Sequence, residues 1–355
     1  MNPNFWKNKK VLLTGHTGFK GSWLSIWLKK IGVDLIGFSK DVPTEPSLFE
    51  LANVSKDMTS VMGDIRNFSV IQKIIEENQP DIIIHMAAQA LVRDSYINPL
   101  ETFSTNIMGT VNILEAIKIS KKTRVMINVT SDKCYENKGI VNNFSEDAAM
   151  GGYDPYSSSK GCSELISSAY RNSFYNIEDF ESHKLSLSTV RAGNVIGGGD
   201  WAKDRLIPDI ITGIKEKRII EIRNSKAIRP WQFVLEPLNG YLLLAEKMWK
   251  DGERFSESWN FGPNNEDCKS VEWILEKISK KWNGEIEWSE KNVKNFHEDL
   301  VLKLNCEKAK TRLEWRTKLD INQTIEWTIN WYKEFLKKSN MKKYTDEQID
   351  RFMAL

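Results

Sequence analysis

The stretch Val11-Leu-Leu-Thr-Gly-His-Thr-Gly-Phe-Lys-Gly21 decides the fold of this chain. A short apolar run leads directly into Gly15, Gly18 and Gly21, and a helix-length segment at 20–31 follows. In a strand–turn–helix unit the first glycine permits the tight turn, the second lets a pyrophosphate approach the backbone, and the third lets helix and strand pack closely. The free amides of the helix N-terminus then face the phosphates. This stretch therefore predicts a dinucleotide-binding loop.

The pattern around the loop predicts an α/β protein. Apolar strand-like runs occur at 11–14, 33–38, 61–64, 81–87, 124–130 and 185–190. Helix-length segments lie between them at 20–31, 67–78, 100–120 and 156–175. Strands and helices that alternate in this way form a parallel sheet covered on both faces. We therefore expect a Rossmann-type doubly wound parallel sheet over residues 1–190.

The second half of the chain predicts a smaller, mixed α/β domain. The regular alternation fades after about residue 195, and helical patterns return at 235–250, 269–281 and 322–337. We expect residues 191–355 to form this domain, with some later segments returning to the first. The tail at 345–353 has the pattern of a short helix that opens with a capping box formed by Thr345 and Gln348.

The composition excludes several classes of protein. Fifty Lys and Arg nearly balance forty-eight Asp and Glu among 355 residues, for a formal charge of +2. This balance argues against a nucleic-acid partner, although it permits a small anionic ligand. The four cysteines and four histidines are scattered without CxxC or HxH spacing, so we expect no metal site and a reducing cytoplasm. The N-terminal residues lack an apolar signal core, and no apolar run suits a membrane span.

Residues after the second and third strands bear on the choice of dinucleotide. Asp41 lies twenty residues after Gly21, directly behind Lys40. If Asp41 reaches the ribose hydroxyls, NAD is favoured; if Lys40 faces them, a 2′-phosphate is accommodated. Asp64 and Ile65 follow the third strand and are placed to touch an adenine, although an ordinary strand end explains them equally well.

A second motif supplies candidate catalytic residues. Tyr156-Ser-Ser-Ser-Lys160 places a phenol and an ammonium four residues apart on one helix face. A neighbouring ammonium favours phenolate, so we expect a lowered pKa for Tyr156. Thr130 and Ser131 end the fifth strand. With the glycine loop, these residues resemble the extended short-chain dehydrogenase/reductases, a family that combines this glycine spacing with a Ser/Thr, Tyr and Lys triad.

Longer motifs resemble the CDP-glucose 4,6-dehydratase branch of that family, over nearly the whole chain. They begin at the glycine loop and include Ala87-Ala-Gln-Ala-Leu-Val-Arg93, Thr130-Ser-Asp-Lys-Cys-Tyr135, Arg191-Ala-Gly-Asn-Val-Ile-Gly-Gly-Gly-Asp-Trp201 and Arg229-Pro-Trp-Gln-Phe-Val-Leu-Glu-Pro237. Most nucleotide-sugar 4,6-dehydratases carry Thr-Asp-Glu after the fifth strand. Ser131, Asp132 and Lys133 stand there in this chain, so Lys133 takes the place of the usual carboxylate base.

The resemblance implies a reaction and a role for each catalytic residue. Tyr156 would remove the proton of the glucose 4-hydroxyl, and Lys160 would assist it and hold the nicotinamide ribose. Ser131 would hydrogen-bond the sugar near O4, Asp132 would protonate the departing 6-hydroxyl, and Lys133 would act at C5. The product would be CDP-4-keto-6-deoxy-D-glucose, which feeds deoxysugar synthesis of the O-antigen or lipopolysaccharide type. A surface ion pair between Asp132 and Lys133 is the structural alternative.

The resemblance also implies the ligands and their contacts. NAD would occupy residues 1–190, and the nucleotide sugar mainly 191–355, without a metal. The expected cofactor-binding residues are Gly15, Thr17, Gly18, Phe19, Lys20, Gly21, Asp41, Asp64, Ile65, Ala87, Ala88, Tyr156 and Lys160. Those expected for substrate are Asn194, Arg205 and Arg229.

Several residues admit a structural interpretation instead. Arg191 and Arg205 are equally consistent with structural ion pairs, His16 with ordering of the glycine loop, and His85 with a core position. Family analogy implies a homo-dimer or homo-tetramer that associates through the helices at 100–120 and 156–175. Two alternative functions keep this fold: a nucleotide-sugar 4-epimerase or reductase, which has no need of the acid Asp132, and a non-catalytic dinucleotide-binding protein.

Overall fold

A seven-stranded parallel sheet forms the centre of the protein. The computed structural model describes residues 1–139, 143–282, 286–290 and 301–355. The strands are hydrogen-bonded in the order β3, β2, β1, β4, β5, β7, β12, and each neighbouring pair is parallel. In that order they span Thr59–Met62, Asp34–Ser39, Lys10–Thr14, Ile82–His85, Val125–Val129, Ser186–Ala192 and Ser258–Phe261. The strand order reverses between β1 and β4, which confirms the predicted doubly wound sheet and places a ligand crevice there.

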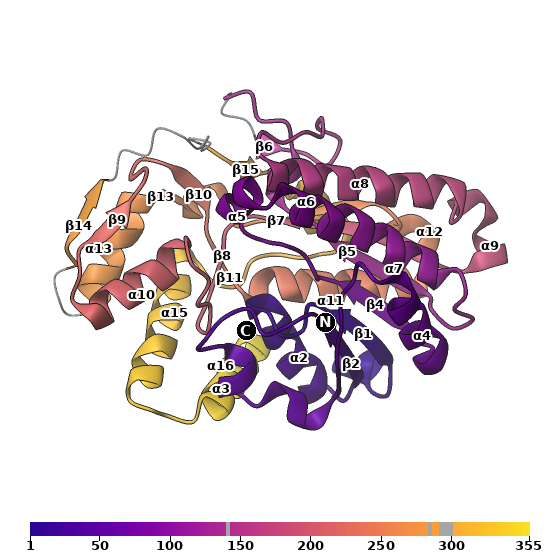
Figure 1. Cartoon of the computed structure of the whole chain (residues 1–355), viewed down its shortest axis with the longest axis horizontal. Helices are drawn as coiled ribbons and strands as arrows, with labels where there is room; N and C mark the ends of the chain where they lie inside the picture. Colours follow the sequence, from indigo (N-terminus) through magenta and orange to yellow (C-terminus); the bar gives the residue numbers. More distant parts are fainter. Residues whose placement is uncertain (140–142, 283–285, 291–300) are drawn as a thin grey trace.

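Each face of the sheet has its own hydrophobic core. Val11 and Leu13 belong to one core and Leu12 to the other, because successive side chains of a strand point to opposite faces. The helices α4, α7 and α8 cover one face, while α2 and α11 cover the other (Figure 1). These five helices span Phe68–Asn78, Gly109–Ile117, Pro155–Ser173, Phe19–Lys30 and Leu235–Lys250.

The strand β12 was not expected from the sequence. It contains four residues, Ser258 to Phe261, and pairs with β7 at the sheet edge, with Trp259 opposite Val190. Its side chains are buried by α11 and by segments that are distant in sequence. The four residues therefore show no alternation of apolar and polar residues that would predict a strand. The chain after residue 195 therefore returns to the central sheet.

The helix expected at 100–120 is interrupted. It consists of α6 (Pro99–Phe103), a π-helical turn at Ser104–Met108, and α7. Single π-helical turns within α-helices occur often at functional sites. Asn106, within this turn, donates to the Ser159 hydroxyl on α8 at 2.8 Å and so ties the two helices together.

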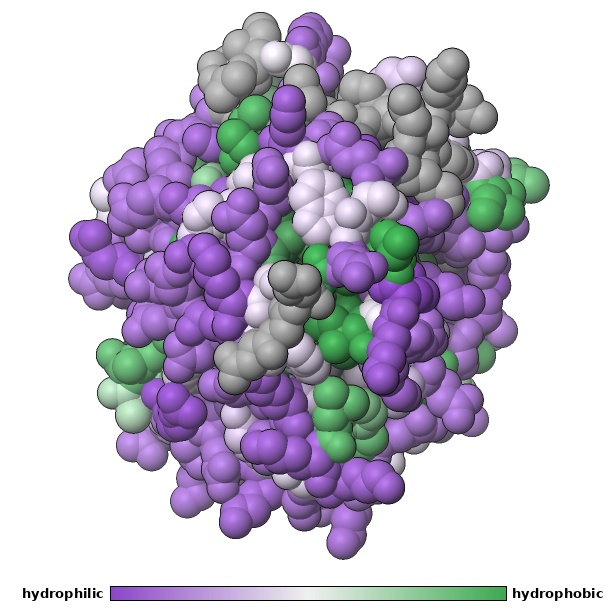
Figure 2. Space-filling view, turned by 90° about the vertical axis from the view of Figure 1, so that its left-hand side faces the viewer, coloured by the Kyte–Doolittle hydropathy of each residue, from purple (hydrophilic) through white to green (hydrophobic). Residues whose placement is uncertain are grey.

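A small lobe stands beside the sheet. It consists of α10 (Leu206–Glu216), β9 (Ile220–Ile222), β10 (Ile228–Pro230), β13 (Cys268–Ser270), α13 (Val271–Trp282) and β14 (Trp288–Glu290). β9 pairs with β14, and β10 pairs with β13. The surface seen from this side is mainly hydrophilic, with apolar residues gathered in a central hollow (Figure 2). The short strands β8 (Val195–Ile196) and β11 (Gln232–Phe233) pair beside the base of the lobe.

The C-terminal helix starts earlier than the sequence predicted. The final helix α16 (Met341–Ala354) begins after the N-cap Asn340, whose side chain accepts from the Lys343 amide at 3.0 Å. Thr345 is buried and accepts from the Trp331 indole at 2.9 Å, on α15 (Ile321–Leu336). The predicted capping box at Thr345 and Gln348 is therefore wrong, because tertiary packing engages both side chains.

Short elements complete the fold. They are α1 (Pro3–Trp6), α3 (Leu48–Leu51), α5 (Val92–Ile97), β6 (Asn143–Phe144), α9 (Phe180–His183), α12 (Gly252–Phe255), β15 (Lys303–Leu304) and α14 (Glu307–Arg312). Over the described ranges, none of the helices combines the length and the apolar character that crossing a bilayer requires.

Candidate active site

One cleft collects all the residues that the sequence predicted for the site. It has a volume of about 1210 Å³ and lies at the carboxyl ends of the parallel strands, between the sheet and the small lobe. Its lining includes Gly15, Thr17, Gly18, Phe19, Lys20, Gly21, Asp41, Asp64, Ile65, Ala87, Ala88, Ser131, Asp132, Lys133, Tyr156, Lys160, Asn194, Arg205 and Arg229. Residues more than 200 positions apart in sequence are thus neighbours here.

The glycine loop has the geometry of a phosphate cradle. Gly15 has φ +78°, and a Cβ there would lie 2.8 Å from the Ala87 amide nitrogen. A Cβ at Gly21 would lie 2.0 Å from the Gly15 carbonyl oxygen, whereas one at Gly18 would meet nothing closer than 3.5 Å. The turn and the close packing of α2 on the loop therefore require Gly15 and Gly21, while Gly18 leaves the backbone open to the cleft.

Both histidines near the cleft are structural. His16 is buried and hydrogen-bonds the hydroxyls of Ser39 and Ser60 at 2.8 and 2.7 Å, so it orders the loop; burial lowers its pKa to about 4. His85 is buried against the Thr14 hydroxyl at 2.7 Å, and burial lowers its pKa to about 3. The prediction that His85 is a core residue is confirmed.

The charged residues Lys40 and Asp64, which line one end of the cleft, form ion pairs within the protein. The Lys40 ammonium contacts the Glu101 carboxylate at 2.9 Å, and Arg66 contacts Asp64 at 2.6 Å. Asp41 is exposed, and its carbonyl accepts from the Thr17 hydroxyl at 2.6 Å. The Lys40 cation is thus directed toward α6, which weakens the alternative that it faces a 2′-phosphate.

Tyr156 and Lys160 lie one turn apart on α8, which starts with Pro155 after the N-cap Asp154. Both side chains are buried at the end of β5, where Lys160 donates to the Val129 carbonyl at 3.2 Å. Burial lowers the pKa of Lys160 to about 8.

The expected lowering of the Tyr156 pKa is wrong in this structure. Burial raises the pKa of Tyr156 to about 12, and the hydrogen bond with Ser131 and the charge of Arg205 only partly oppose that rise. Desolvation of the phenolate outweighs the nearby cations here.

Ser131, Asp132 and Lys133 form a tight turn after β5. The Ser131 hydroxyl accepts from the Lys133 amide at 3.2 Å and donates to Asp132 Oδ1 at 3.1 Å. Asp132 is only 5% exposed, which excludes the alternative of a surface ion pair with Lys133. The Lys133 side chain is half-buried and lines the same cleft.

The two ambiguous arginines have different roles. Arg191 is buried and binds the Glu164 carboxylate at 2.8 Å, so it is a structural ion pair outside the cleft lining. Arg205 lines the cleft, contacts Asp200 at 3.0 Å and acts electrostatically on Tyr156. Arg229 is buried on β10 and Asn194 is half-buried between β7 and β8.

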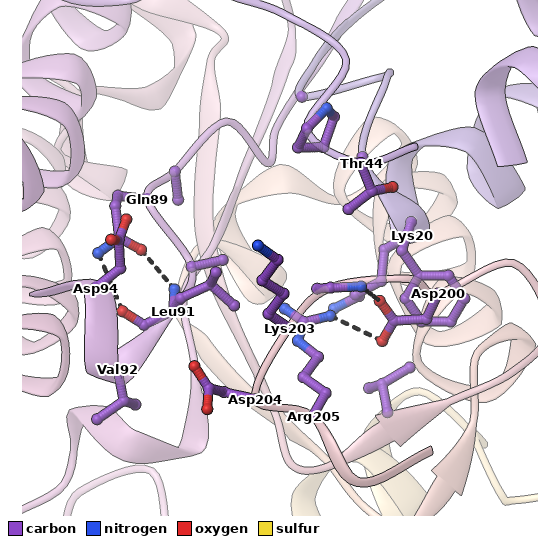
Figure 3. Close-up of a pocket in the computed structure, with 18 of the residues that line it drawn as sticks. Lys20, Thr44, Gln89, Leu91, Val92, Asp94, Asp200, Lys203, Asp204 and Arg205 are labelled. Carbon is purple, nitrogen blue, oxygen red and sulfur yellow. Dashed lines mark hydrogen bonds and ion pairs between the residues drawn. The ribbon is translucent and has the colours of Figure 1, made fainter. Parts of the chain in front are cut away.

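Three features of the cleft were not predicted. Arg93 of α5 contacts Asp204, in the loop before α10, at 2.7 Å and so joins opposite walls. Asp200 orients Arg205, and both lie across the cleft from Gln89 and Asp94 (Figure 3). Asp200 and Arg93 belong to the long motifs, so this signal was available in the sequence.

Lys20 was predicted as a cofactor-binding residue, and its contact with Tyr241 is the third feature that was not predicted. Its ammonium donates to the Tyr241 hydroxyl at 3.1 Å, and the charges of Lys160 and Asp132 act on it. Burial, together with the charges of Lys160 and Arg205, lowers the pKa of Lys20 to about 7.

This combination of a doubly wound sheet, a glycine cradle and a buried Ser-Tyr-Lys group defines a short-chain dehydrogenase/reductase type of protein. The chain belongs to the GDP-mannose 4,6 dehydratase family, whose model matches residues 12–328. It is 48% identical to the CDP-glucose 4,6-dehydratase of Salmonella typhimurium over 354 residues, which cover 100% of this chain and 99% of that protein.

Solved structures share the fold at lower identity. The dTDP-glucose 4,6-dehydratase of Bacillus anthracis in complex with NAD superposes with a TM-score of 0.77 at 22% identity, over 94% of this chain and 99% of that one. An epimerase of Methanothermobacter thermautotrophicus gives a TM-score of 0.81 at 20% identity, over 96% of each chain. At these identities the structures establish the fold that is common to dehydratases and epimerases.

Proposed function

We propose that this protein is an NAD-dependent hydro-lyase that converts CDP-D-glucose to CDP-4-keto-6-deoxy-D-glucose. The observation that carries this proposal is the position of Asp132. A buried carboxyl group, hydrogen-bonded to the Ser131 hydroxyl, lines the same cleft as Tyr156 and acts on it electrostatically, whereas a 4-epimerase has no need of an acid there. The 48% identity with the Salmonella typhimurium CDP-glucose 4,6-dehydratase supports the same substrate.

The cradle between Gly15 and Ala87 fits NAD. The backbone at Gly18 is open to the cleft, and the N-terminus of α2 presents amides for a diphosphate. Among the residues that line the cleft, Asp64 and Ile65 would hold the adenine, Asp41 the ribose, and Tyr156 and Lys160 the nicotinamide end of the cofactor. When bound, NAD accepts a hydride from C4 of the sugar and returns it at C6. Because the cofactor is regenerated within one turnover, the overall reaction is a dehydration.

The chain's own groups perform the proton transfers. Tyr156 takes the proton of the 4-hydroxyl, and Ser131 hydrogen-bonds near O4. The resulting ketone acidifies the C5 proton, which Lys133 removes and later returns. Asp132 protonates O6 as it leaves as water. Each of these groups lies at the end of β5 or on the first turns of α8, within the same cleft.

The nucleotide diphosphate lies at the small-lobe side of the cleft. Asn194, Arg205 and Arg229 supply an amide and two guanidinium groups there. In this arrangement residues 1–190 mainly hold the cofactor and residues 191–355 mainly hold the nucleotide sugar. The four cysteines are all free thiols, which supports a reducing compartment such as the cytoplasm.

Incubation with CDP-glucose and catalytic NAD tests this function. We expect a 4-keto-6-deoxy product without net formation of NADH. Inversion at C4 would instead identify an epimerase, and net NADH a dehydrogenase. CDP-glucose is also expected to raise the Tm more than dTDP-glucose or UDP-glucose at equal concentration, because the tighter ligand shifts unfolding further. Equal increases in Tm with the three nucleotide sugars would contradict the assignment of CDP-glucose as the substrate.

We also propose that the protein is a homo-oligomer that associates through α6 and α8. These helices are in contact, and Leu100 and Leu165 on them are 86% and 60% exposed. Ile97 and Met108 nearby are also exposed, so apolar side chains gather on this side of the sheet. A second copy of the chain would bury them.

Leu100→Asp should therefore shift the protein toward monomer in sedimentation or light-scattering measurements, because a charge would be buried at the interface. Ile219→Asp is the matched control, since Ile219 is 54% exposed but lies beside α10 in the small lobe. A monomeric wild type, or equal effects of both substitutions, would contradict this interface.

A further inference from the structure

Four charged side chains meet where the strands β2 and β3 end. Lys40 directly follows β2, and Asp64 and Arg66 follow β3. Glu101 comes from α6, which lies after β4 in the chain. Lys40, Asp64 and Glu101 line the cleft. A dinucleotide-binding sheet holds the adenosine ribose after its second strand, so these charges bear on the recognition of a ribose with or without a 2′-phosphate.

The Glu101 carboxylate contacts both cations of this cluster. Its Oε1 atom accepts from the Lys40 ammonium at 2.9 Å and lies 4.0 Å from Nη2 of Arg66. Asp64 Oδ2 accepts from Nε and Nη2 of the same guanidinium, at 3.0 and 2.6 Å. The contact with Glu101 raises the pKa of Lys40, and the contact with Arg66 lowers the pKa of Asp64. Two cations and two carboxylates thus form one cluster in which the charges cancel.

The two carboxylates of the cluster reach it by different routes. Asp64 and Arg66 are two residues apart in one turn, so their pairing needs no other part of the chain. Glu101 is separated from Lys40 by 61 positions, and the fold of α6 brings them together. Removal of the Glu101 charge would leave Lys40 without this ion pair, while Arg66 would retain Asp64.

The balance of charge in this cluster favours one kind of ribose. A phosphate monoester carries a charge of about −1.5 to −2 at pH 7 and pairs with cations. A 2′-phosphate would have to displace Glu101 from Lys40 or lie beside its carboxylate, and like charges at short range repel each other. A 2′-hydroxyl is uncharged and can donate to a carboxylate such as that of Asp41, which directly follows Lys40.

We propose that Glu101 is a specificity-determining residue through which this protein selects NAD over NADP, an inference that rests on the proposed NAD-dependent function. The carboxylate acts through Lys40 and Arg66, because it engages their charges within the protein and withholds them from a 2′-phosphate. The sequence places Lys40 next to Asp41 and so leaves both dinucleotides open. A side chain from another element of the fold decides between them.

Equilibrium binding of NAD and of NADP, without sugar, tests this role by titration calorimetry of the full-length chain freed of bound dinucleotide. The wild type should bind NAD more tightly than NADP. Glu101→Gln should tighten NADP binding about fivefold, the scale of interactions between partly exposed charges, and should change the Kd for NAD less than about twofold. The gain for NADP should shrink above an ionic strength of about 0.15 M, where the Debye length falls below about 8 Å.

Glu115→Gln is the matched control. Glu115 on α7 is 38% exposed and contacts Lys118 at 2.8 Å, whereas Glu101 is 42% exposed. Glu115 lies outside the cleft lining, so the same substitution there should leave both Kd values unchanged. Because α6 belongs to the proposed oligomer interface, sedimentation of both variants accompanies the titrations. A change of assembly alone would alter the binding of NAD and NADP equally.

Lys40→Gln completes a double-mutant cycle with Glu101→Gln. If Glu101 acts by engaging Lys40, more than half of the gain in NADP affinity should disappear when Lys40 is also replaced. An undiminished gain, an unchanged preference for NAD in Glu101→Gln, or a wild type that binds both dinucleotides equally would overturn this role and leave the dehydratase function in place. A wild type that bound neither dinucleotide, or formed product only with NADP, would overturn the proposed NAD dependence itself.

Discussion

Replacement of Tyr156 by Phe is expected to lower kcat for CDP-glucose dehydration by about 10²–10⁴-fold, the usual contribution of a general acid–base group. In the proposed function the phenol receives the O4 proton, and its side chain is buried at the lining of the cleft. Phe keeps the ring and its packing but cannot accept or pass on a proton. The measurement is steady-state formation of the 4-keto-6-deoxy product with saturating NAD.

Tyr153→Phe is the matched control for this substitution. Tyr153 lies three residues earlier but is 75% exposed and outside the cleft lining. Its substitution should leave kcat near the wild-type value. A Tyr156→Phe enzyme with wild-type turnover would show that the catalytic base had been assigned wrongly. Thermal unfolding of both variants would separate a chemical defect from a folding defect.

Replacement of Glu164 by Ala is expected to lower the free energy of unfolding by about 3–5 kcal/mol, because it leaves a buried charge without its partner. Glu164 accepts from Nε and Nη2 of Arg191, at 2.9 and 2.8 Å, and from the hydroxyls of Thr130 and Thr189 at 2.5 and 2.6 Å. The Glu164 and Arg191 side chains are only 3% and 2% exposed. Chemical denaturation measures the change.

Two comparisons distinguish loss of the ion pair from loss of packing. Replacing both partners, with Glu164→Leu and Arg191→Met, should be less destabilising than Glu164→Ala, because no isolated charge remains buried. Glu181→Ala removes the exposed pair with Lys184 and should change stability little. A Glu164→Ala protein as stable as the Glu181→Ala protein would contradict the proposed contribution of the buried ion pair to the free energy of unfolding.

This ion pair also matters for the site. Glu164 lies one helical turn after Lys160 on α8, and its partner Arg191 is on β7. The pair therefore holds the helix that carries Tyr156 and Lys160 against β7, the neighbour of β5 in the sheet. The charge of Glu164 also raises the pKa of Lys160, against the larger effect of burial. Catalytic geometry and stability thus depend on the same buried contact.

Much of the fold was predictable because its signals are local. The apolar run before Gly15 and the alternation through residue 190 correspond to six strands of the observed sheet. The last helix was misplaced because Thr345 and Gln348 form tertiary hydrogen bonds rather than a cap. The strand β12 was not predicted, because its four residues at the sheet edge are too few to show an alternating hydrophobic pattern.

The candidate site, like the fold, could be predicted from the sequence only in part. Its residues belong to short motifs, so their positions could be read directly, and all of them line one cleft. The sequence could not separate the structural Arg191 from the cleft-lining Arg205, because the ion pair of Arg191 with Glu164 forms only in the folded chain. It also predicted a lowered pKa for Tyr156, whereas burial raises that pKa.

The sequence by itself determined the strand–turn–helix units, the glycine loop and the set of chemical groups at the ends of the strands. Turn requirements and side-chain periods act over a few residues, so they can be recognised without the fold. The tertiary structure alone decided which charges are paired, which distant residues line one cleft, and in which direction burial shifts the pKa of the phenol. Those properties depend on desolvation and on contacts between distant segments, and neither exists until the chain has folded.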